Sequence, residues 1–382
     1  MGNPALSAAD PTTIGFISEP GGLGGGEISL LTLLEHLPEG YHPTLLTYAD
    51  GPLVDRCREM GIPTKVIHRG GVMSLPRVAR QSADWLRETN ATLVHVNTLD
   101  IRGGLAARIA GLPLVGHLRV IMPFTWIDRL FVRMSNRVIS VSDAAGAKLS
   151  RGRRSISSKL QVIPNAVAPP GSDRSLRAEL GLAETDLLVG GIGRFDPVKG
   201  FEYLIEAIGR ARTTHPNLHL VLIGAPGEDQ DQQEYAAMLD REVHRQGLSD
   251  TVTFTGFRPN AAALLAGLDI MAVPSIPRET ESGIWEEGFG RVAAEGMSAS
   301  IPVIVSQSGG LAEIIEEGVT GKVVPPADSD ALSDAICELA ISPEKRKRLG
   351  QEGRQTFLQR YTVEHHVDQV TRLYATLLGK VG

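Results

Sequence analysis

The sequence lacks the usual marks of secreted, membrane-spanning and metal-binding proteins. Only two cysteines, Cys57 and Cys337, occur in 382 residues, which is too few for a disulfide framework and gives no zinc-ligand spacing. No run of 18 or more apolar residues is present, so we expect no membrane-spanning helix. The first eleven residues have no basic segment followed by an apolar core, and we expect no secretory signal. These absences favour a cytoplasmic protein.

Charge is modest overall but unevenly distributed. The formal net charge is −6. Residues 1–170 hold 18 basic and 13 acidic side chains, which leaves 20 basic and 31 acidic ones in the rest of the chain. A basic N-terminal half favours an anionic acceptor or peripheral contact with a membrane surface, although a chance fluctuation in charge would give the same counts. We expect no nucleic-acid partner.

Strand-like and helix-like patterns alternate along the chain, which predicts parallel sheets covered by helices. A chain of this length is long for one core, so two domains are expected. The segment 167–173 is rich in Pro and Gly and is the predicted linker. Strands are expected at 12–18, 44–48, 65–68, 92–96, 114–118, 137–141 and 160–163 before the linker, and at 186–192, 218–223, 251–254, 268–273 and 302–305 after it.

The segment 285–296, W-E-E-G-F-G-R-V-A-A-E-G, combines acidic residues and glycines at the start of a predicted helix. Gly288 to Gly290 would place backbone N–H groups at the helix N-terminus, which attracts anions. Glu287 would lie in the loop beside that end, and Glu295 about two turns into the helix. This arrangement suits a phosphate-bearing ligand with hydroxyls on both sides, such as a nucleotide sugar.

Residues in three further segments have chemistry that suits the same ligand. Arg194 and Lys199 flank a turn after a glycine-rich strand end, where two cations would stabilise a departing diphosphate; a solvated surface pair is the alternative. Gly24 and Gly25 would let the backbone approach a phosphate after the first strand, although such glycines are common in α/β proteins. His117 ends a predicted strand and is expected to face a cleft, although a lone histidine is more often structural.

Other motifs are ambiguous. Gly22 and Gly24, followed by Asp50, partly match a dinucleotide-binding loop, but the last glycine of that motif is replaced by Glu27. The pair Asp229 and Asp231 has the spacing of a D-x-D metal motif, yet we interpret it as the start of a helix. The pair His365-His366 lacks further ligands and is interpreted as helix surface.

Taken in order, these motifs resemble those of the retaining glycosyltransferases of family 4. The segment from Glu287 matches that family's E-G-F-G followed by a second Glu. The others are R-F-D-P-V-K-G at 194–200, S-G-G-L-A-E at 308–313, I-P-N-A-V at 163–167 and G-G-G-E at 24–27. The departures are small: Gly296 and Ala166 stand where the family usually has Ala and Gly.

The resemblance implies an α/β protein of GT-B fold, with two Rossmann-like domains facing across a cleft. The expected N-terminal acceptor domain is 1–168, and the donor domain is 174–361. A C-terminal helix at about 362–382 would cross back to the first domain.

The resemblance also implies roles for the site residues. Arg194 and Lys199 would contact the donor diphosphate, Glu287 the sugar hydroxyls and Glu295 the ribose, with His117 near the donor sugar. Backbone near Phe257 and Arg258 would select the base. The expected catalytic residues are Glu287, His117, Arg194 and Lys199; the expected donor-binding residues are Gly24, Gly25, Glu287, Gly288, Phe289, Gly290, Glu295 and Arg258.

The expected activity is metal-independent, retaining transfer of a sugar, without a cofactor. The donor would be a nucleoside-diphosphate sugar, UDP favoured, and the acceptor a hydroxyl of a sugar, a lipid-linked molecule or a small molecule. A non-catalytic nucleotide-sugar binding subunit and a GT-B sugar-nucleotide epimerase are the alternatives.

Two stretches have no assigned role. Residues 120–137 mix aromatic and arginine side chains, as an interfacial face for a lipid-linked acceptor would and as a buried helix with arginines reaching to solvent also would. The segment 276–285 is expected to be a loop longer than the family usually places there.

Overall fold

The computed structural model describes residues 11–380 except 20, 170, 172–174, 260 and 282. The chain divides into two compact units. Unit 1 runs to Arg119 and continues through 124–166 and from Val363 onward; unit 2 takes in 120–123 and 167–362. Residues 1–10 and positions 170, 172 and 173 of the predicted linker lie outside the described part.

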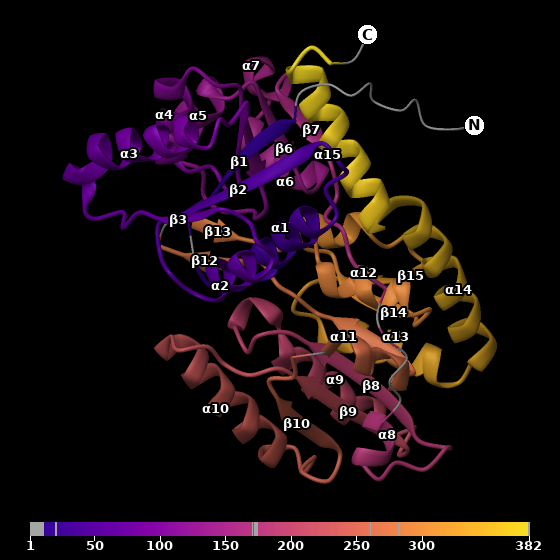
Figure 1. Ribbon diagram of the computed structural model, residues 1–382. Helices are drawn as coiled ribbons and strands as arrows, with labels where there is room; N and C mark the ends of the chain where they lie inside the picture. Colours follow the sequence, from indigo (N-terminus) through magenta and orange to yellow (C-terminus); the bar gives the residue numbers. More distant parts are fainter. Residues whose placement is uncertain are drawn as a thin grey trace, which may run out of the picture. The chain divides into compact units, whose positions relative to one another are not determined.

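Unit 1 is built on a seven-stranded parallel sheet (Figure 1). Its order is β3-β2-β1-β4-β5-β6-β7, so the chain changes direction across the sheet between β1 and β4. The strands in the middle of the sheet are almost wholly buried, as expected for a parallel sheet with both faces covered, whereas the two edge strands are only partly buried. They are β1 (Thr12–Ser18), β2 (Tyr41–Thr47), β3 (Thr64–Val66), β4 (Leu93–Val96), β5 (Leu114–Leu118), β6 (Arg137–Ser140) and β7 (Leu160–Val162).

Two groups of helices cover this sheet. Apolar side chains of α1 (Gly25–Glu35), α2 (Pro52–Glu59) and α15 (Val363–Leu377) share one core cluster with the strands. Those of α3 (Leu75–Glu88), α4 (Ile101–Ala110) and α5 (Trp126–Met134) share another. The remaining helices of the unit are the 3-10 turn η1 (Val72–Ser74), α6 (Asp143–Ser150) and α7 (Arg154–Ser157).

Unit 2 repeats this architecture with six parallel strands in the order β10-β9-β8-β11-β14-β15. Its direction change lies between β8 and β11. The strands are β8 (Leu187–Ile192), β9 (Leu218–Ile223), β10 (Val252–Gly256), β11 (Ile270–Val273), β14 (Val303–Ser306) and β15 (Gly321–Val324). The helices are α8 (Ser175–Glu179), α9 (Phe201–Ala211), α10 (Gln230–Arg245), α11 (Ala261–Leu264), α12 (Arg291–Ser298), α13 (Ser329–Ala340) and α14 (Pro343–Arg360), with 3-10 turns η2 (Pro197–Lys199), η3 (Leu265–Gly267) and η4 (Gly309–Glu313).

The expected strands agree with the structure to within a few residues, with two exceptions. Strand β15 was not predicted; it is short, and two of its four residues are Gly321 and Lys322. The segment 276–285 was expected to be a loop but contains an antiparallel pair, β12 (Arg278–Thr280) and β13 (Gly283–Trp285). Alternation over three residues is too short a signal to distinguish from a loop.

The last helix, α15, belongs to unit 1 although the chain reaches it from unit 2. Val363, Val367, Val370 and Leu373 recur at helical spacing and are all buried in the cluster that α15 shares with α1. Among the helices that the structure describes, none is long and apolar enough to cross a membrane.

Candidate active site

In unit 2, the predicted donor-site motifs follow three neighbouring strands of one parallel sheet. Arg194 and Lys199 follow β8, Glu287 follows β11 after the β12–β13 pair, and Gly309 follows β14. The carboxyl ends of parallel strands lie at one edge of a sheet, and ligands bind there where the strand order changes direction. That change lies between β8 and β11, so the topology brings these motifs to the expected binding edge.

Lys199 and Glu287 form a close ion pair at this edge. Lys199 Nζ donates to Glu287 Oε2 at 2.7 Å, although the two residues are 88 positions apart in the sequence. About a quarter of each side chain is exposed. The charge of Lys199 lowers the pKa of the Glu287 carboxyl, and the Gly290 N–H, which donates to the same carboxylate, lowers it further against the opposing effect of burial. Glu287 is therefore ionised at neutral pH.

The turn that carries Lys199 is held by its neighbours. Asp196 caps the 3-10 turn by accepting from Val198 N at 3.1 Å, and its other oxygen accepts from Gln232 at 3.0 Å. Gly200 has φ +63°, and a Cβ there would lie 2.3 Å from the Pro274 carbonyl oxygen just after β11. Only glycine fits this contact, which packs the β8 loop against the β11 loop.

The start of α12 is held in a similar way. Gly290 is its N-cap with φ 90°, and a Cβ there would lie 2.4 Å from Leu311. Gly310 N donates to the Glu287 carbonyl at 2.9 Å, while Gly309, at φ +51°, lies against the same oxygen. The glycine pair after β14 therefore positions the backbone of Glu287. The Gly290 N–H, which was expected to face a ligand, is engaged by the Glu287 carboxylate.

The choice between the adjacent acids Glu286 and Glu287 follows from the backbone. Glu286 forms an antiparallel bridge with Ile121, and its N–H donates to Ile121 O at 3.0 Å. The next side chain, Glu287, is the one that reaches Lys199. Glu295 is the fifth residue of α12, one turn in rather than the two expected. It is largely buried and pairs with Arg291 Nη2 at 3.2 Å.

The other two predicted site arginines of unit 2, Arg194 and Arg258, differ in how far their side chains are exposed to solvent. The Arg194 side chain is 61% exposed, and its nearest recorded acid is Asp196 at 3.9 Å. Arg258 is less exposed and pairs with Glu179. The neighbouring Phe257 is 76% exposed, which is unusual for a large aromatic side chain.

In unit 1, the glycine loop follows β1 at that unit's own change of strand direction. Gly24 is the N-cap of α1 and Gly25 its first residue. The Glu27 carboxylate accepts from Gly24 N at 3.0 Å, which satisfies one of the free backbone donors at the start of the helix. Glu27, which disqualified the dinucleotide motif, thus has a local structural role.

His117 lies within β5 and is fully buried rather than exposed at a strand end. Its Nδ1 is 3.1 Å from His95 Nε2, and its Nε2 has no hydrogen-bond partner among the described residues. His366 was interpreted as helix surface, and that prediction is wrong. It is buried, its ring stacks on His117 at 6.3 Å between centroids, and its Nδ1 donates to Pro164 O at 2.7 Å.

Arg119 joins three segments of unit 1. Its Nε donates to Asn97 Oδ1 and its Nη1 to Asn165 Oδ1, both at 2.6 Å. Asn97 follows β4 and Asn165 follows β7, so the side chain links the ends of separate strands. No signal in the sequence indicates this pairing: Asn97 lies in no motif, and the I-P-N-A-V segment that contains Asn165 does not indicate a partner for it.

Asp229 is the N-cap of α10, and Asp231 lies in its first turn, as predicted. Across the described residues, no group of three or more His, Cys, Asp or Glu side chains could hold a metal ion. Metal independence remains a prediction. In α5, Phe131 is buried but Trp126 is 70% exposed, so this helix has both a core side and an exposed apolar side.

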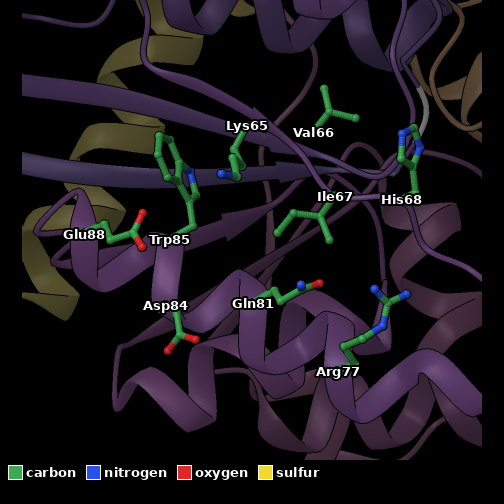
Figure 2. Close-up of a pocket in the computed structure, with 9 residues that line it drawn as sticks. All are labelled: Lys65, Val66, Ile67, His68, Arg77, Gln81, Asp84, Trp85 and Glu88. Carbon is green, nitrogen blue, oxygen red and sulfur yellow. The ribbon is translucent and has the colours of Figure 1, made fainter.

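A shallow pocket lies elsewhere in unit 1, between β3 and α3 (Figure 2). Lys65 Nζ lies 6.0 Å from the centroid of the Trp85 ring. None of the predicted site residues lines this pocket. Its lining residues are Lys65, Val66, Ile67, His68, Arg77, Gln81, Asp84, Trp85 and Glu88.

Two family models match the chain in the order that its motifs suggested. Glycosyltransferase Family 4 matches residues 23–169, and Glycosyl transferases group 1 matches residues 172–356. Together the two ranges take in most of the chain and correspond closely to units 1 and 2.

Curated relatives are similar at moderate identity. A D-inositol 3-phosphate glycosyltransferase of Stackebrandtia nassauensis is 28% identical over 273 residues, or 68% of this chain and 58% of that protein. The lipopolysaccharide core biosynthesis mannosyltransferase LpcC of Rhizobium leguminosarum bv. viciae is 28% identical over 67% of this chain and 68% of its own length. The chain thus spans little more than half the length of the first relative.

Among solved structures, HepE of Anabaena in complex with UDP superposes with a TM-score of 0.82 at 26% identity, covering 96% of this chain and all of that one. This match agrees with the two parallel-sheet units. From the family models, the relatives and the fold together, the chain belongs to the family 4, group 1 glycosyltransferases of GT-B fold.

Proposed function

We propose that the protein is a retaining glycosyltransferase that moves a sugar from a nucleoside-diphosphate donor to an acceptor hydroxyl without a metal ion. The observation that carries this proposal is the Lys199–Glu287 pair at the start of α12, beside the change of strand direction in unit 2. A cation and a helix N-terminus together attract a diphosphate. A carboxylate that remains ionised accepts hydrogen bonds from sugar hydroxyls.

In the proposed reaction, the bond between the sugar C1 and the diphosphate oxygen breaks, and the acceptor oxygen bonds C1 on the same face. The departing phosphate oxygen takes the acceptor proton. Lys199 and Arg194 stabilise the charge that develops on that phosphate. Glu287 holds the sugar hydroxyls and Glu295 the ribose. The family pattern supports these assignments.

UDP is the proposed nucleotide, because HepE structures are described in complex with UDP and with UDP-glucose. The proposed acceptor is a sugar, a lipid-linked molecule or a small molecule. LpcC, a relative that acts in lipopolysaccharide core biosynthesis, supports the first two.

The first test is a thermal-shift screen against UDP, GDP, ADP, TDP and NAD, each with and without EDTA. A ligand at 100 times its Kd adds about 2.7 kcal/mol to the stability of the state that it binds. We expect UDP to stabilise the protein equally with and without EDTA. Stabilisation by NAD alone, or only with added metal ions, would contradict the proposal.

A second test separates an enzyme from a non-catalytic binding subunit. Glu287→Ala should abolish sugar transfer, whereas Glu286→Ala serves as the matched control, because Glu286 pairs with Ile121 through its backbone. The product's anomeric configuration, measured by NMR, should equal that of the donor. An inverted product would refute retention. Interconversion of sugar nucleotides without any acceptor would indicate an epimerase instead.

A further inference from the structure

We propose that Tyr374 and His95 are positioning residues that fix the tautomer of His117. Through them the C-terminal helix makes His117 a hydrogen-bond donor at Nε2. This inference rests on the proposed function and on the family pattern, which places His117 near the donor sugar, and it specifies which kind of contact the ring makes.

The three side chains form a continuous chain of hydrogen bonds inside unit 1. Tyr374, on α15, places its hydroxyl 2.5 Å from His95 Nδ1. His95, on β4, places Nε2 3.1 Å from Nδ1 of His117 on the neighbouring strand β5. All three side chains are fully buried. The chain therefore runs from the C-terminal helix through two adjacent strands and ends at His117 Nε2.

Both histidines are held in the neutral state. Burial lowers the pKa of His95 and of His117, and the positive charge of Arg119 lowers both further. His366 is the other titratable group that faces this pair, and it acts in the same direction. A neutral imidazole carries one N–H donor and one acceptor nitrogen, so each ring must adopt one of two tautomers.

The Tyr374 hydroxyl selects between them. The recorded hydrogen bond of this hydroxyl is the one to His95 Nδ1, and a buried O–H without an acceptor is costly. Donation by Tyr374 makes His95 Nδ1 an acceptor, which puts the His95 proton on Nε2. That proton then points at His117 Nδ1, which must accept. The proton of His117 is thereby placed on Nε2.

His117 Nε2–H is thus a buried donor without a partner among the described residues. A ligand oxygen that accepts from it would satisfy a group that is otherwise unpaired. Sugar hydroxyls supply such oxygens. In this tautomer the ring has no lone pair on Nε2, so it does not act as a base toward the acceptor hydroxyl, and the proton must leave by another route. The phosphate oxygen of the proposed mechanism provides that route.

The tautomer is measured directly by ¹⁵N NMR of ligand-free protein labelled at histidine, with His117 assigned from the spectrum of His117→Gln. We expect the His117 proton on Nε2 in the wild type and a mixture of tautomers in Tyr374→Phe. The matched control is Tyr41→Phe. It removes a hydroxyl that donates to Thr371 O on the same helix as Tyr374 but takes no part in the Tyr374–His95–His117 hydrogen bonds. A wild-type proton on Nδ1, or an unchanged tautomer in Tyr374→Phe, would overturn the inference.

A second variant, His95→Gln, tests the inference if Tyr374→Phe does not fold. In His95→Gln the side-chain amide can still donate to His117 Nδ1, so His117 should keep its proton on Nε2. Loss of that tautomer in a folded His95→Gln protein would contradict the relay.

Steady-state kinetics test whether the tautomer of His117 affects the rate of sugar transfer. We expect Tyr374→Phe to lower kcat at least about tenfold, since loss of tautomer control lowers kcat by about 10⁴ in serine proteases, while UDP affinity is unchanged. In a His117→Gln background the amide donates without any tautomer, so Tyr374→Phe should have no further effect. A further loss of the same size would refute the coupling. Wild-type turnover by His117→Ala would instead refute a contact between His117 and the donor sugar, while the NMR result stands on its own.

Discussion

Replacing Lys199 tests whether its contact with Glu287 is energetically important or only a surface contact. Lys199→Met keeps most of the alkyl stem and removes the charge, and Glu287→Gln keeps the shape of its partner. Both side chains are less than a quarter exposed, so solvent screens the pair only in part. A hydrogen bond to a charged group of this kind contributes about 1.5–3 kcal/mol.

We therefore expect a coupling of about 2 kcal/mol in the double-mutant cycle, measured by urea unfolding at pH 7. In a domain of about 200 residues this corresponds to about 4–8 °C in Tm for Lys199→Met. The same substitution should lower kcat by about 10²–10³, the range found when one preorganised charge-stabilising donor is removed. The two measurements are independent, because the first needs no substrate.

The pH dependence of the coupling has a definite sign. Lys199 lowers the pKa of Glu287 in the folded state, below its ordinary value of 4.5. The stability from the pair is therefore fully present above about pH 4.5 and is lost as the pH falls toward the lowered value. If the effects of Lys199→Met and Glu287→Gln add to within about 0.3 kcal/mol, the contact carries no coupling and the reasoning fails.

Three further outcomes are expected. Gly290→Ala should lower the free energy of unfolding by about 2–3 kcal/mol, because Gly290 has a left-handed φ and an added Cβ would overlap Leu311. Gly318→Ala is the control for the backbone effect alone, since Gly318 has a similar φ and no atom near the added Cβ. If urea unfolding shows the same loss of stability for both variants, the overlap with Leu311 contributes nothing. Burial lowers the pKa of His95 and of His117, so both rings are neutral in the folded protein while free histidines become protonated as the pH falls. The free energy of unfolding should therefore be highest above pH 6.5 and fall below that pH by up to about 1.4 kcal/mol per pH unit for each ring. A free energy of unfolding that stays constant down to pH 5 would contradict the burial of two neutral rings. Overnight dialysis against EDTA should leave turnover unchanged, whereas activity restored only by added Mg²⁺ or Mn²⁺ would show that the reaction needs a metal.

The strands and the family motifs could largely be recognised from short segments of the sequence. Parallel strands buried on both faces give short apolar runs, and helices between them give a second period, so the alternation could be recognised without contacts. Where the local signal was weak, prediction failed: β15 begins with Gly321, and the β12–β13 pair is formed by segments of three residues. The buried position of His366 also could not be predicted, because the adjacent His365 is exposed on the same helix.

The sequence by itself determined which residue types stand at the carboxyl ends of the strands, because each motif lies within a few residues of the strand that positions it. Only the tertiary structure decided which of them meet. Glu287 pairs with Lys199 across 88 residues, and His95 pairs with Tyr374 across 279. Such contacts depend on strand order and on the packing of α15, which are set by burial of apolar surface over the whole unit rather than by local sequence.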